Sequence, residues 1–115
     1  MDNETIPLDS ASNFAEEPLY ILSLLNNEFM SSSWKLVSGD YNIGRSSNSN
    51  IILDDVTVSR DHAILSVNNQ RLKIIDSNST NGIYVNNEIK SDYELRSGDK
   101  IQVGKYLLLL TEVIK

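Results

Sequence analysis

Short apolar runs separated by Asn and Gly pairs limit what this chain of 115 residues can fold into. Three pairs of neighbouring runs each flank two residues that favour tight turns: Asn68-Asn69, Asn86-Asn87 and Gly104-Lys105. Antiparallel hairpins are the natural connection between runs that lie this close together. No stretch shows sustained helical spacing with helix start and stop signals. The sequence therefore predicts an all-β domain.

The apolar runs themselves have the length of strands, and their close spacing is typical of a β-sandwich or barrel. The expected strands are Leu19–Leu25, Trp34–Val37, Tyr41–Ile43, Ile51–Leu53, Ala63–Val67, Leu72–Ile75, Ile83–Val85, the segment around Ile89, Ile101–Val103 and Tyr106–Ile114. We therefore expect one domain over residues 19–115.

The charge of the chain is concentrated at its N-terminus, where residues 1 to 18 hold five acids and no Lys or Arg. The net charge of -6 belongs almost entirely to this segment, so the rest is nearly neutral and shows no basic stripe for nucleic acid. We expect residues 1–18 to be an acidic, flexible tail, because they contain too few large apolar residues to offset the entropy of ordering.

Several classes of protein are excluded by composition. The chain has no Cys and one His, so a disulfide framework, a thiolate metal site and a histidine metal cluster are all excluded, and no cofactor is expected. The longest apolar run, Tyr106 to Leu110, is far shorter than the ~20 residues of a membrane helix. The N-terminus lacks the basic and apolar regions of a signal peptide. We expect a cytoplasmic protein with no membrane partner.

Three polar segments follow directly after predicted strands: Ile43-Gly44-Arg45-Ser46-Ser47, Thr57-Val58-Ser59-Arg60-Asp61-His62 and Ser77-Asn78-Ser79-Thr80-Asn81-Gly82. Because alternate loops of a sandwich gather at the same end, we expect some of their side chains to converge. Guanidinium, hydroxyl and amide groups are suited to binding phosphate. The candidate phosphate-binding residues are Arg45, Ser59, Arg60, Thr80 and Asn81.

At these segments the chain resembles the forkhead-associated family. The family pattern is Gly-Arg, then Ser-x-x-His, then Asn-Gly, with a further Gly downstream; here it reads Gly44-Arg45, Ser59-Arg60-Asp61-His62, Asn81-Gly82 and Gly98-Asp99. The resemblance implies a two-sheet β-sandwich of about eleven mostly antiparallel strands whose loops bind a phosphothreonine peptide.

The resemblance also implies a role for individual residues. Arg45 and Ser59 would hold the phosphate, and Arg60 stands where the family often has another phosphate or peptide contact. Thr80 would shape the pocket around the threonine side chain, and Asn81 would fix the peptide backbone. The supporting residues would be Gly44, His62 and Gly82, with His62 bracing the loops from beneath rather than contacting the ligand.

Enzymatic and metal-binding interpretations are weaker. Nothing supplies Ser59 with a base, an orienting carboxylate and an oxyanion hole together, so we expect no catalytic residue and no enzyme activity. The spacing of Asp54, Asp55 and Asp61 matches no metal loop, and we expect these carboxylates to form a solvated edge.

A closer resemblance links Ile51 to Ala63 and Gly98 to Tyr106 with the small actinobacterial regulators typified by the glycogen accumulation regulator and the oxoglutarate dehydrogenase inhibitor. It implies a regulator of enzymes that use 2-oxoglutarate, including dehydrogenases, and a Ser/Thr kinase that phosphorylates a threonine of the tail. The phosphorylated tail would then bind the domain's own pocket. Thr5 is the candidate, although the group's usual adjacent pair of threonines is here a single one.

Three functions therefore stay open. The first is a regulator that reads phosphothreonine. The second is an inhibitor that binds folded metabolic enzymes without phosphate through the same end of the sandwich, and the two can be two states of one protein. The third is a general scaffold that recruits a kinase to its substrates through phosphothreonine.

Overall fold

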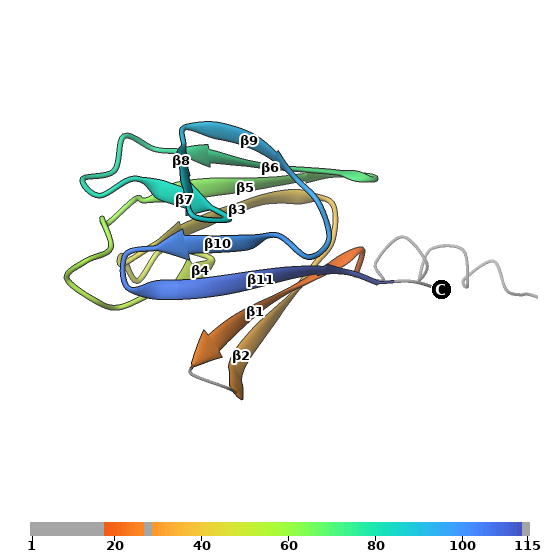
Figure 1. Ribbon diagram of the computed structural model, residues 1–115, viewed down its shortest axis with the longest axis horizontal. Coiled ribbons are helices and arrows are strands. Elements are labelled where there is room, and N and C mark those ends of the chain that lie inside the picture. The colour runs from red at the N-terminus through yellow and green to blue at the C-terminus, as the bar shows by residue number, and fades with distance from the viewer. Residues whose placement is uncertain (1–17, 27–28, 114–115) are drawn as a thin grey trace, which may run out of the picture.

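The computed structural model describes residues 18–26 and 29–113. These residues contain eleven strands, joined by turns and loops (Figure 1). Strand β9 was not expected from the sequence. The strands are β1 (Tyr20–Asn26), β2 (Phe29–Leu36), β3 (Gly39–Gly44), β4 (Ile51–Ile52), β5 (Ala63–Asn68), β6 (Arg71–Asp76), β7 (Ile83–Val85), β8 (Glu88–Lys90), β9 (Asp92–Leu95), β10 (Lys100–Val103) and β11 (Tyr106–Glu112).

The strands form two sheets. One has six strands in the order β2-β1-β11-β10-β7-β8, and the other has five in the order β4-β3-β5-β6-β9. Every pairing is antiparallel except that of β3 with β4, which is parallel. The predicted all-β, two-sheet sandwich is thus confirmed.

A single apolar core lies between the two sheets. Alternate residues of each strand point inward, so Leu22, Leu65, Ile83 and Leu108 are completely buried while their chain neighbours face outward. Burial of apolar surface at about 25 cal/mol per Å² is the main force that holds the sheets together. The described residues include no helix that is long and apolar enough to cross a membrane.

The tight turns explain the register of the hairpins. Asn86 and Asn87 both have positive φ, 51° and 73°, as the two central residues of a type I′ turn require. Gly104 has a φ of 59° at the first central position of the β10–β11 turn, where a type II′ turn needs it. These two hairpins were expected at the correct residues.

Strand β9 has a pattern too polar to be noticed in the sequence. Its outward residues Asp92 and Glu94 are exposed, while Tyr93 packs against the core and Leu95 is buried. β9 lies at the edge of the five-stranded sheet, where its partner is β6. Residues 1–17, with the expected phosphorylation site Thr5, and Ile114, the expected end of the last strand, lie outside the described residues.

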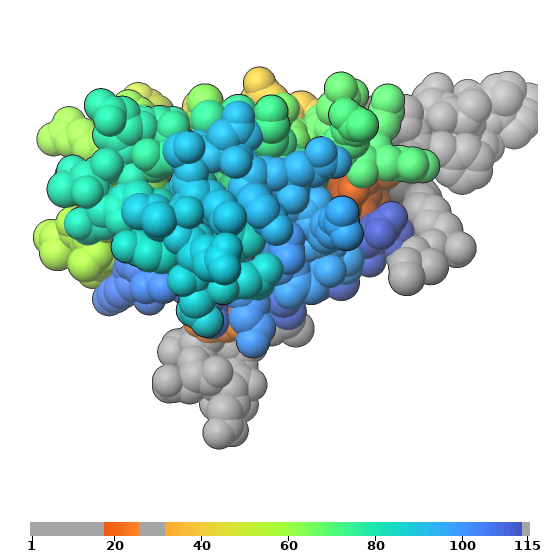
Figure 2. Space-filling view, turned by 45° about the horizontal axis from the view of Figure 1, so that its top comes forward, coloured from red at the N-terminus to blue at the C-terminus, as the bar shows by residue number. Residues whose placement is uncertain are grey.

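The connections that carry the candidate residues lie at one end of the sandwich. The β3–β4, β4–β5, β6–β7 and β10–β11 connections are all at the left of Figure 1, and Figure 2 shows the loops in light green and teal protruding at that same end. We call it the loop end. Leu19 and the β5–β6 turn lie at the opposite end.

Candidate functional site

Arg45 is held at the loop end by two hydrogen bonds to the β4–β5 loop. Its amide donates to the carbonyl of Ser59 at 3.0 Å, and its Nε donates to the carbonyl of Val58 at 3.0 Å. The side chain is half-buried, and it forms no ion pair with another described residue. The guanidinium is therefore fixed in direction while its charge stays unneutralised, which suits it to bind an anion.

Gly44 allows the β3–β4 and β4–β5 loops to approach each other. A Cβ at this position would lie 2.0 Å from the carbonyl oxygen of Arg60, which no side chain can tolerate. The same carbonyl accepts the amide of Ser46 at 3.3 Å. The contact explains why a glycine must precede Arg45.

Ser59 and His62 connect the β4–β5 loop to the β6–β7 loop. The Oγ of Ser59 accepts the amide of Thr80 at 3.0 Å. The amide of Ser59 donates to Nδ1 of His62 at 2.9 Å, and Nε2 of His62 lies 2.8 Å from the carbonyl of Gly82. Since Nδ1 accepts, Nε2 carries the proton and donates to Gly82. His62 is completely buried beneath the loops and does not reach their surface.

The β6–β7 loop is shaped by two residues that the sequence analysis did not single out. The Oγ of Ser79 donates to Asp76 Oδ1 at 2.5 Å and accepts the amide of Gly82 at 2.9 Å. The carboxylate of Asp76 also accepts the amide of Ser79 at 3.3 Å. These bonds fold the loop so that Thr80 and Asn81 are exposed at its tip. The Asp76–Ser79 spacing is an ordinary turn signal, which could have been used to find them.

Asn81 is oriented by a hydrogen bond from its Nδ2 to the carbonyl of Thr57 at 2.9 Å. This bond leaves the Oδ1 atom and the second amide hydrogen of Asn81 free for a peptide backbone. A shallow hollow next to Asn81 extends to the β10–β11 turn; it is lined by Thr57, Asn81, Gly82, Tyr84, Gln102, Gly104 and Lys105.

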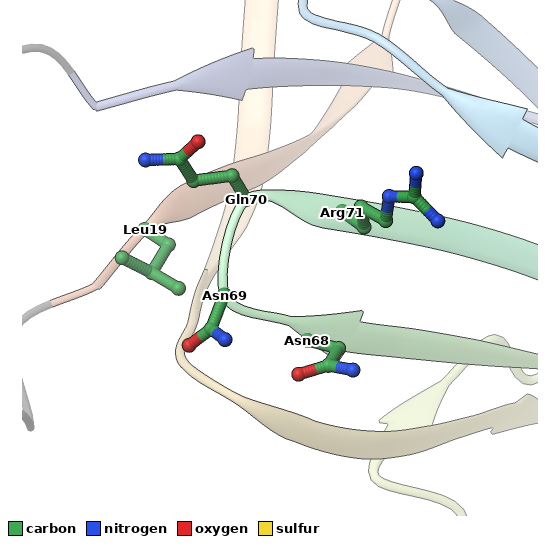
Figure 3. A pocket seen from close by; sticks show the side chains of 5 residues that line it. All are labelled: Leu19, Asn68, Asn69, Gln70 and Arg71. Carbon is green, nitrogen blue, oxygen red and sulfur yellow. The ribbon is translucent and has the colours of Figure 1, made fainter.

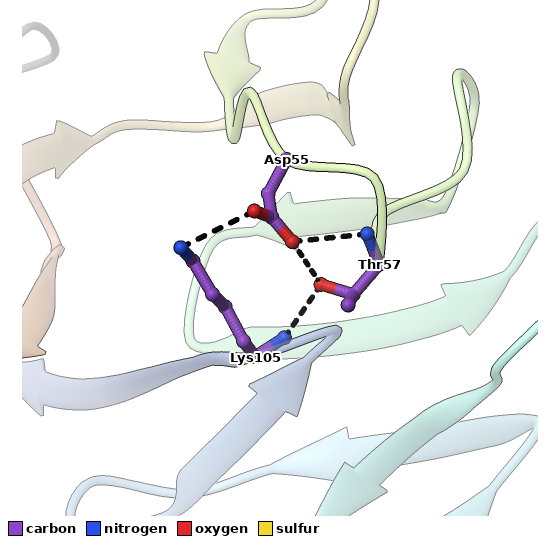
Figure 4. A network of polar contacts seen from close by, with 3 residues as sticks. All are labelled: Asp55, Thr57 and Lys105. Carbon is purple, nitrogen blue, oxygen red and sulfur yellow. Dashed lines mark hydrogen bonds and ion pairs between the residues drawn. The ribbon is translucent and has the colours of Figure 1, made fainter.

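A network of three side chains joins the β4–β5 loop to the β10–β11 turn (Figure 4). The Oγ1 of Thr57 donates to Asp55 Oδ2 at 2.6 Å and accepts the amide of Lys105 at 2.9 Å. The Nζ of Lys105 lies 3.2 Å from Asp55 Oδ1. Asp55 thus serves as a loop organiser, and the expectation of a purely solvated acidic edge is wrong for this residue. Asp54 and Asp61 are exposed, as expected.

The same network changes the titration of its two charged groups. Hydrogen bonds from the hydroxyl and the amide of Thr57, with a smaller contribution from Lys105, lower the pKa of Asp55 to about 2. The hydrogen bond and charge of Asp55 raise the pKa of Lys105 above its ordinary value. Both groups are therefore ionised at neutral pH.

The structure brings four of the five candidate residues into one connected set. Arg45, Ser59, Thr80 and Asn81 are joined to one another, directly or through Thr57 and Val58, by the hydrogen bonds above. Arg60 is exposed beside them, and its backbone carbonyl is its link to the β3–β4 loop. Among the described residues, no three His, Cys, Asp or Glu side chains are grouped to hold a metal ion.

A second hollow lies at the opposite end of the sandwich, beside the β5–β6 turn (Figure 3). It is lined by Leu19, Asn68, Asn69, Gln70 and Arg71. Close by, the hydroxyl of Tyr20 donates to the carbonyl of Gln70 at 2.9 Å, and burial raises the pKa of Tyr20. None of the candidate phosphate-binding residues lines this hollow.

The two-sheet sandwich and the polar residues of its loops together indicate a domain that binds a ligand through its loops. The sequence pattern of the family described as FHA domain matches residues 41–104, which is more than half of the chain. The chain belongs to the forkhead-associated domain family.

Two groups of curated relatives share this region. An oxoglutarate dehydrogenase inhibitor from Corynebacterium efficiens is 47% identical over 66 residues, which cover 57% of this chain and 46% of the relative. The glycogen accumulation regulator GarA from Mycobacterium tuberculosis is 46% identical over 66 residues, which cover 57% of this chain and 41% of the relative. The chain thus matches less than half the length of these relatives.

Solved structures confirm the fold. A structure from an analysis of phosphothreonine-dependent FHA domain interactions has a TM-score of 0.78 at 29% identity, covering 84% of this chain and 99% of that one. The FhaA FHA domain, in complex with the intracellular domain of Rv3910, has a TM-score of 0.74 at 31% identity, covering 79% and 98%.

Proposed function

We propose that this chain is a non-catalytic regulatory module of the cytoplasm that binds phosphothreonine in partner proteins at its loop end. The observation that carries the proposal is the hydrogen-bonded set of Arg45, Ser59, Thr80 and Asn81, in which a fixed guanidinium has no acidic partner among the described residues. A phosphate placed there would complete the charge-assisted hydrogen bonds that Arg45 lacks.

Each residue has a distinct task in this proposal. The forked guanidinium of Arg45 and the hydroxyl of Ser59 hold the phosphate oxygens, and exposed Arg60 adds charge at the rim. Thr80 seats the threonine methyl, and the amide of Asn81 hydrogen-bonds the peptide backbone. The supporting residues keep the loops in place. Gly44 lets the carbonyl of Arg60 approach closely, and His62 joins the amide of Ser59 to the carbonyl of Gly82.

We further propose that the protein controls enzymes that use 2-oxoglutarate, such as dehydrogenases. The support is the similarity to proteins named oxoglutarate dehydrogenase inhibitor and glycogen accumulation regulator. In this proposal a Ser/Thr kinase phosphorylates Thr5, and the modified segment occupies the loop end and competes with the partners of the domain. Phosphorylation adds about -1.5 to -2 charges and three acceptor oxygens, to which Arg45 and Ser59 can donate hydrogen bonds.

The test of phosphothreonine binding is calorimetry with a peptide of residues 1–12, phosphorylated at Thr5, against its unphosphorylated form. We expect binding of the phosphorylated peptide alone, and equal heats from the two peptides would reject phosphorylated Thr5 as a ligand of the loop end. Immobilised protein, with and without phosphothreonine as competitor, then separates phosphate-dependent partners from enzymes bound without phosphate. Capture of an oxoacid dehydrogenase that phosphothreonine does not displace would favour the phosphate-independent inhibitor.

A further inference from the structure

The outer face of the six-stranded sheet carries a group of apolar side chains. Leu25, Leu107, Gln102 and Tyr84 are successive Cα partners across β1, β11, β10 and β7. Their chain neighbours Leu108, Ile101 and Ile83 are completely buried, so the partner row points away from the core. Tyr84 is 36% exposed, and its β8 partner Ile89 is 63% exposed.

The apolar surface continues along β11 and β1 toward the opposite end of the sandwich. Leu109 is the next outward position of β11; its partner on β1 is Ser23, which is buried at 4%, and Ile21 is the outward position after Ser23. Leu109 and Ile21 are both half-buried although neither belongs to the core. We call Leu25, Leu107, Leu109 and Ile21 the outer stripe. One end of the outer stripe, at Leu107, lies near the β10–β11 turn, where Lys105 forms an ion pair with Asp55. The other end, at Ile21, is two residues after Leu19.

The outer face of the five-stranded sheet is different. A row of Cα partners there consists of Asp40, Ser66, Lys73 and Glu94, and three of these four carry charge. The next outward row, Asn42, Ile64, Ile75 and Asp92, holds two isoleucines between a polar and an acidic residue. The two outer faces therefore differ in charge: the described outward positions of the five-stranded sheet include the acids Asp40, Asp92 and Glu94, whereas those of the six-stranded sheet include none. Apolar surface rimmed by polar residues is the usual mark of an interaction site.

At the outward positions whose side chains the structure describes, the six-stranded sheet has two charged residues, and both are basic. Lys100 is the Cα partner of Leu109, and Lys35 is the Cα partner of Ile21. Both are exposed, and neither forms an ion pair with another described residue. An occupant that fits this face combines apolar side chains with acidic ones.

The N-terminal segment of the same chain has that composition. Residues 1–17 hold five acids and no base, and Ile6, Leu8 and Phe14 are their large apolar residues besides Met1. The segment joins the domain at Leu19, two residues before Ile21 at the end of the outer stripe.

The length of the segment also fits a path over the stripe. β1 and β11 run from Leu19 to the level of Lys105 in about eight residue steps, or about 26 Å at 3.3 Å per residue. The candidate phosphate site is on the neighbouring loops, roughly another 10 Å away, which is the spacing of packed sheets. From Thr5 to Pro18 the chain can span about 43 to 47 Å. The path is thus within reach with a few residues to spare.

We propose that residues 6–17 of the same chain lie over the outer stripe when phosphorylated Thr5 occupies the loop end. Ile6, Leu8 and Phe14 cover the apolar residues, and the acids lie near Lys100 and Lys35. The inference rests on the proposed function, because the phosphate holds one end of the segment while Leu19 holds the other. The segment is then held at both ends and covers the outer stripe on one defined face of the domain.

The test uses engineered cysteines in the full chain, which otherwise has none. Ser12→Cys is combined with Thr111→Cys, at an exposed outward position beside Ile21, in protein that carries phosphothreonine at position 5. The matched control combines Ser12→Cys with Lys73→Cys, which is exposed on the outer face of the other sheet, also near the end where Leu19 lies. Disulfide formation is followed under mild oxidation, and monomer and dimer products are separated.

We expect the Thr111 pair to form an intramolecular disulfide at least about tenfold faster than the Lys73 pair, and Arg45→Ala to remove this difference. Equal rates for the two pairs would overturn the inference, and a disulfide found only in dimers would assign the face to a second copy instead. Calorimetry with the phosphorylated peptide of residues 1–12, on unphosphorylated protein, separates the two proposals. Failure to bind rejects the proposed role of Thr5, whereas binding with equal disulfide rates rejects the path over the outer stripe alone.

Discussion

The imidazole of His62 accepts the amide of Ser59 through Nδ1 and donates to the carbonyl of Gly82 through Nε2, at 2.9 and 2.8 Å. One buried ring therefore joins the loop that carries Ser59 to the loop that carries Thr80 and Asn81. The ring sits below both loops, so its effect on a ligand passes through the positions of these residues.

Replacing His62 with Ala should lower both stability and affinity. The change leaves two backbone groups without partners, at about 1–3 kcal/mol each, and opens a cavity, so we expect the free energy of unfolding to fall by about 3–5 kcal/mol. Urea denaturation measures this loss. The control is Asp61→Ala at the exposed neighbouring residue, which should stay within about 0.5 kcal/mol of the parent. Comparable stability of the two variants would contradict the bracing role.

Replacing Arg45 with Ala should affect binding far more than folding. Loss of a desolvated phosphate contact should weaken phosphothreonine binding by about 2–5 kcal/mol, whereas loss of the Nε bond to Val58 should cost about 1 kcal/mol of stability. Calorimetry and urea denaturation measure the two effects. Arg71→Ala, at the opposite end, is the matched control and should bind like the parent. Near-parent affinity of Arg45→Ala would remove Arg45 from the site.

A phosphothreonine peptide should bind more tightly than the matched phosphoserine peptide. If Thr80 and its loop seat the threonine methyl, burial of that methyl contributes about 0.8 kcal/mol, which is about fourfold in affinity. Competition between the two peptides for a fluorescent phosphothreonine probe measures the ratio. Equal affinities would mean that no methyl seat exists at Thr80.

The sequence predicted the fold well where a turn fixed the register. Asn86-Asn87 and Gly104-Lys105 mark their hairpins, whereas β9 was missed because Asp92 and Glu94 give an edge strand a polar pattern. Local motifs also predict a phosphate-binding role for Arg45 and Ser59, which stays a prediction. The Asp55–Thr57–Lys105 network could not be predicted, because Thr57 and Lys105 are 48 residues apart and the polar loop and tight turn that hold them do not show that they contact each other.

The network makes a prediction about titration. Thr57→Val removes the hydroxyl that donates to Asp55, so the pKa of Asp55 should rise from about 2 toward its ordinary value. Because the folded-state pKa is below the unfolded value of about 3.9, Asp55 stabilises the parent above pH 4, and this contribution is lost as pH falls toward 2. NMR titration of the carboxyl carbon measures the change, with Asp54 as the exposed reference. An unchanged Asp55 titration would mean that Thr57 does not hold the carboxylate.

A comparison of Gly104→Ala with Gly98→Ala distinguishes the effect of backbone strain from the effect of a contact with the β4–β5 loop. Both have positive φ, 59° and 97°, so an Ala at either position should cost on the order of 1–3 kcal/mol of stability through strain. A Cβ on Gly98 would meet nothing within 4 Å, whereas one on Gly104 would lie 2.5 Å from Thr57 Oγ1 and 2.8 Å from the Thr57 carbonyl. That carbonyl orients Asn81, so Gly104→Ala should also weaken phosphothreonine binding, by roughly tenfold for the loss of a net hydrogen bond of about 1.4 kcal/mol. Gly98→Ala should leave binding unchanged. If calorimetry finds the same affinity for both variants, the β10–β11 turn does not position the ligand-binding loop through Thr57.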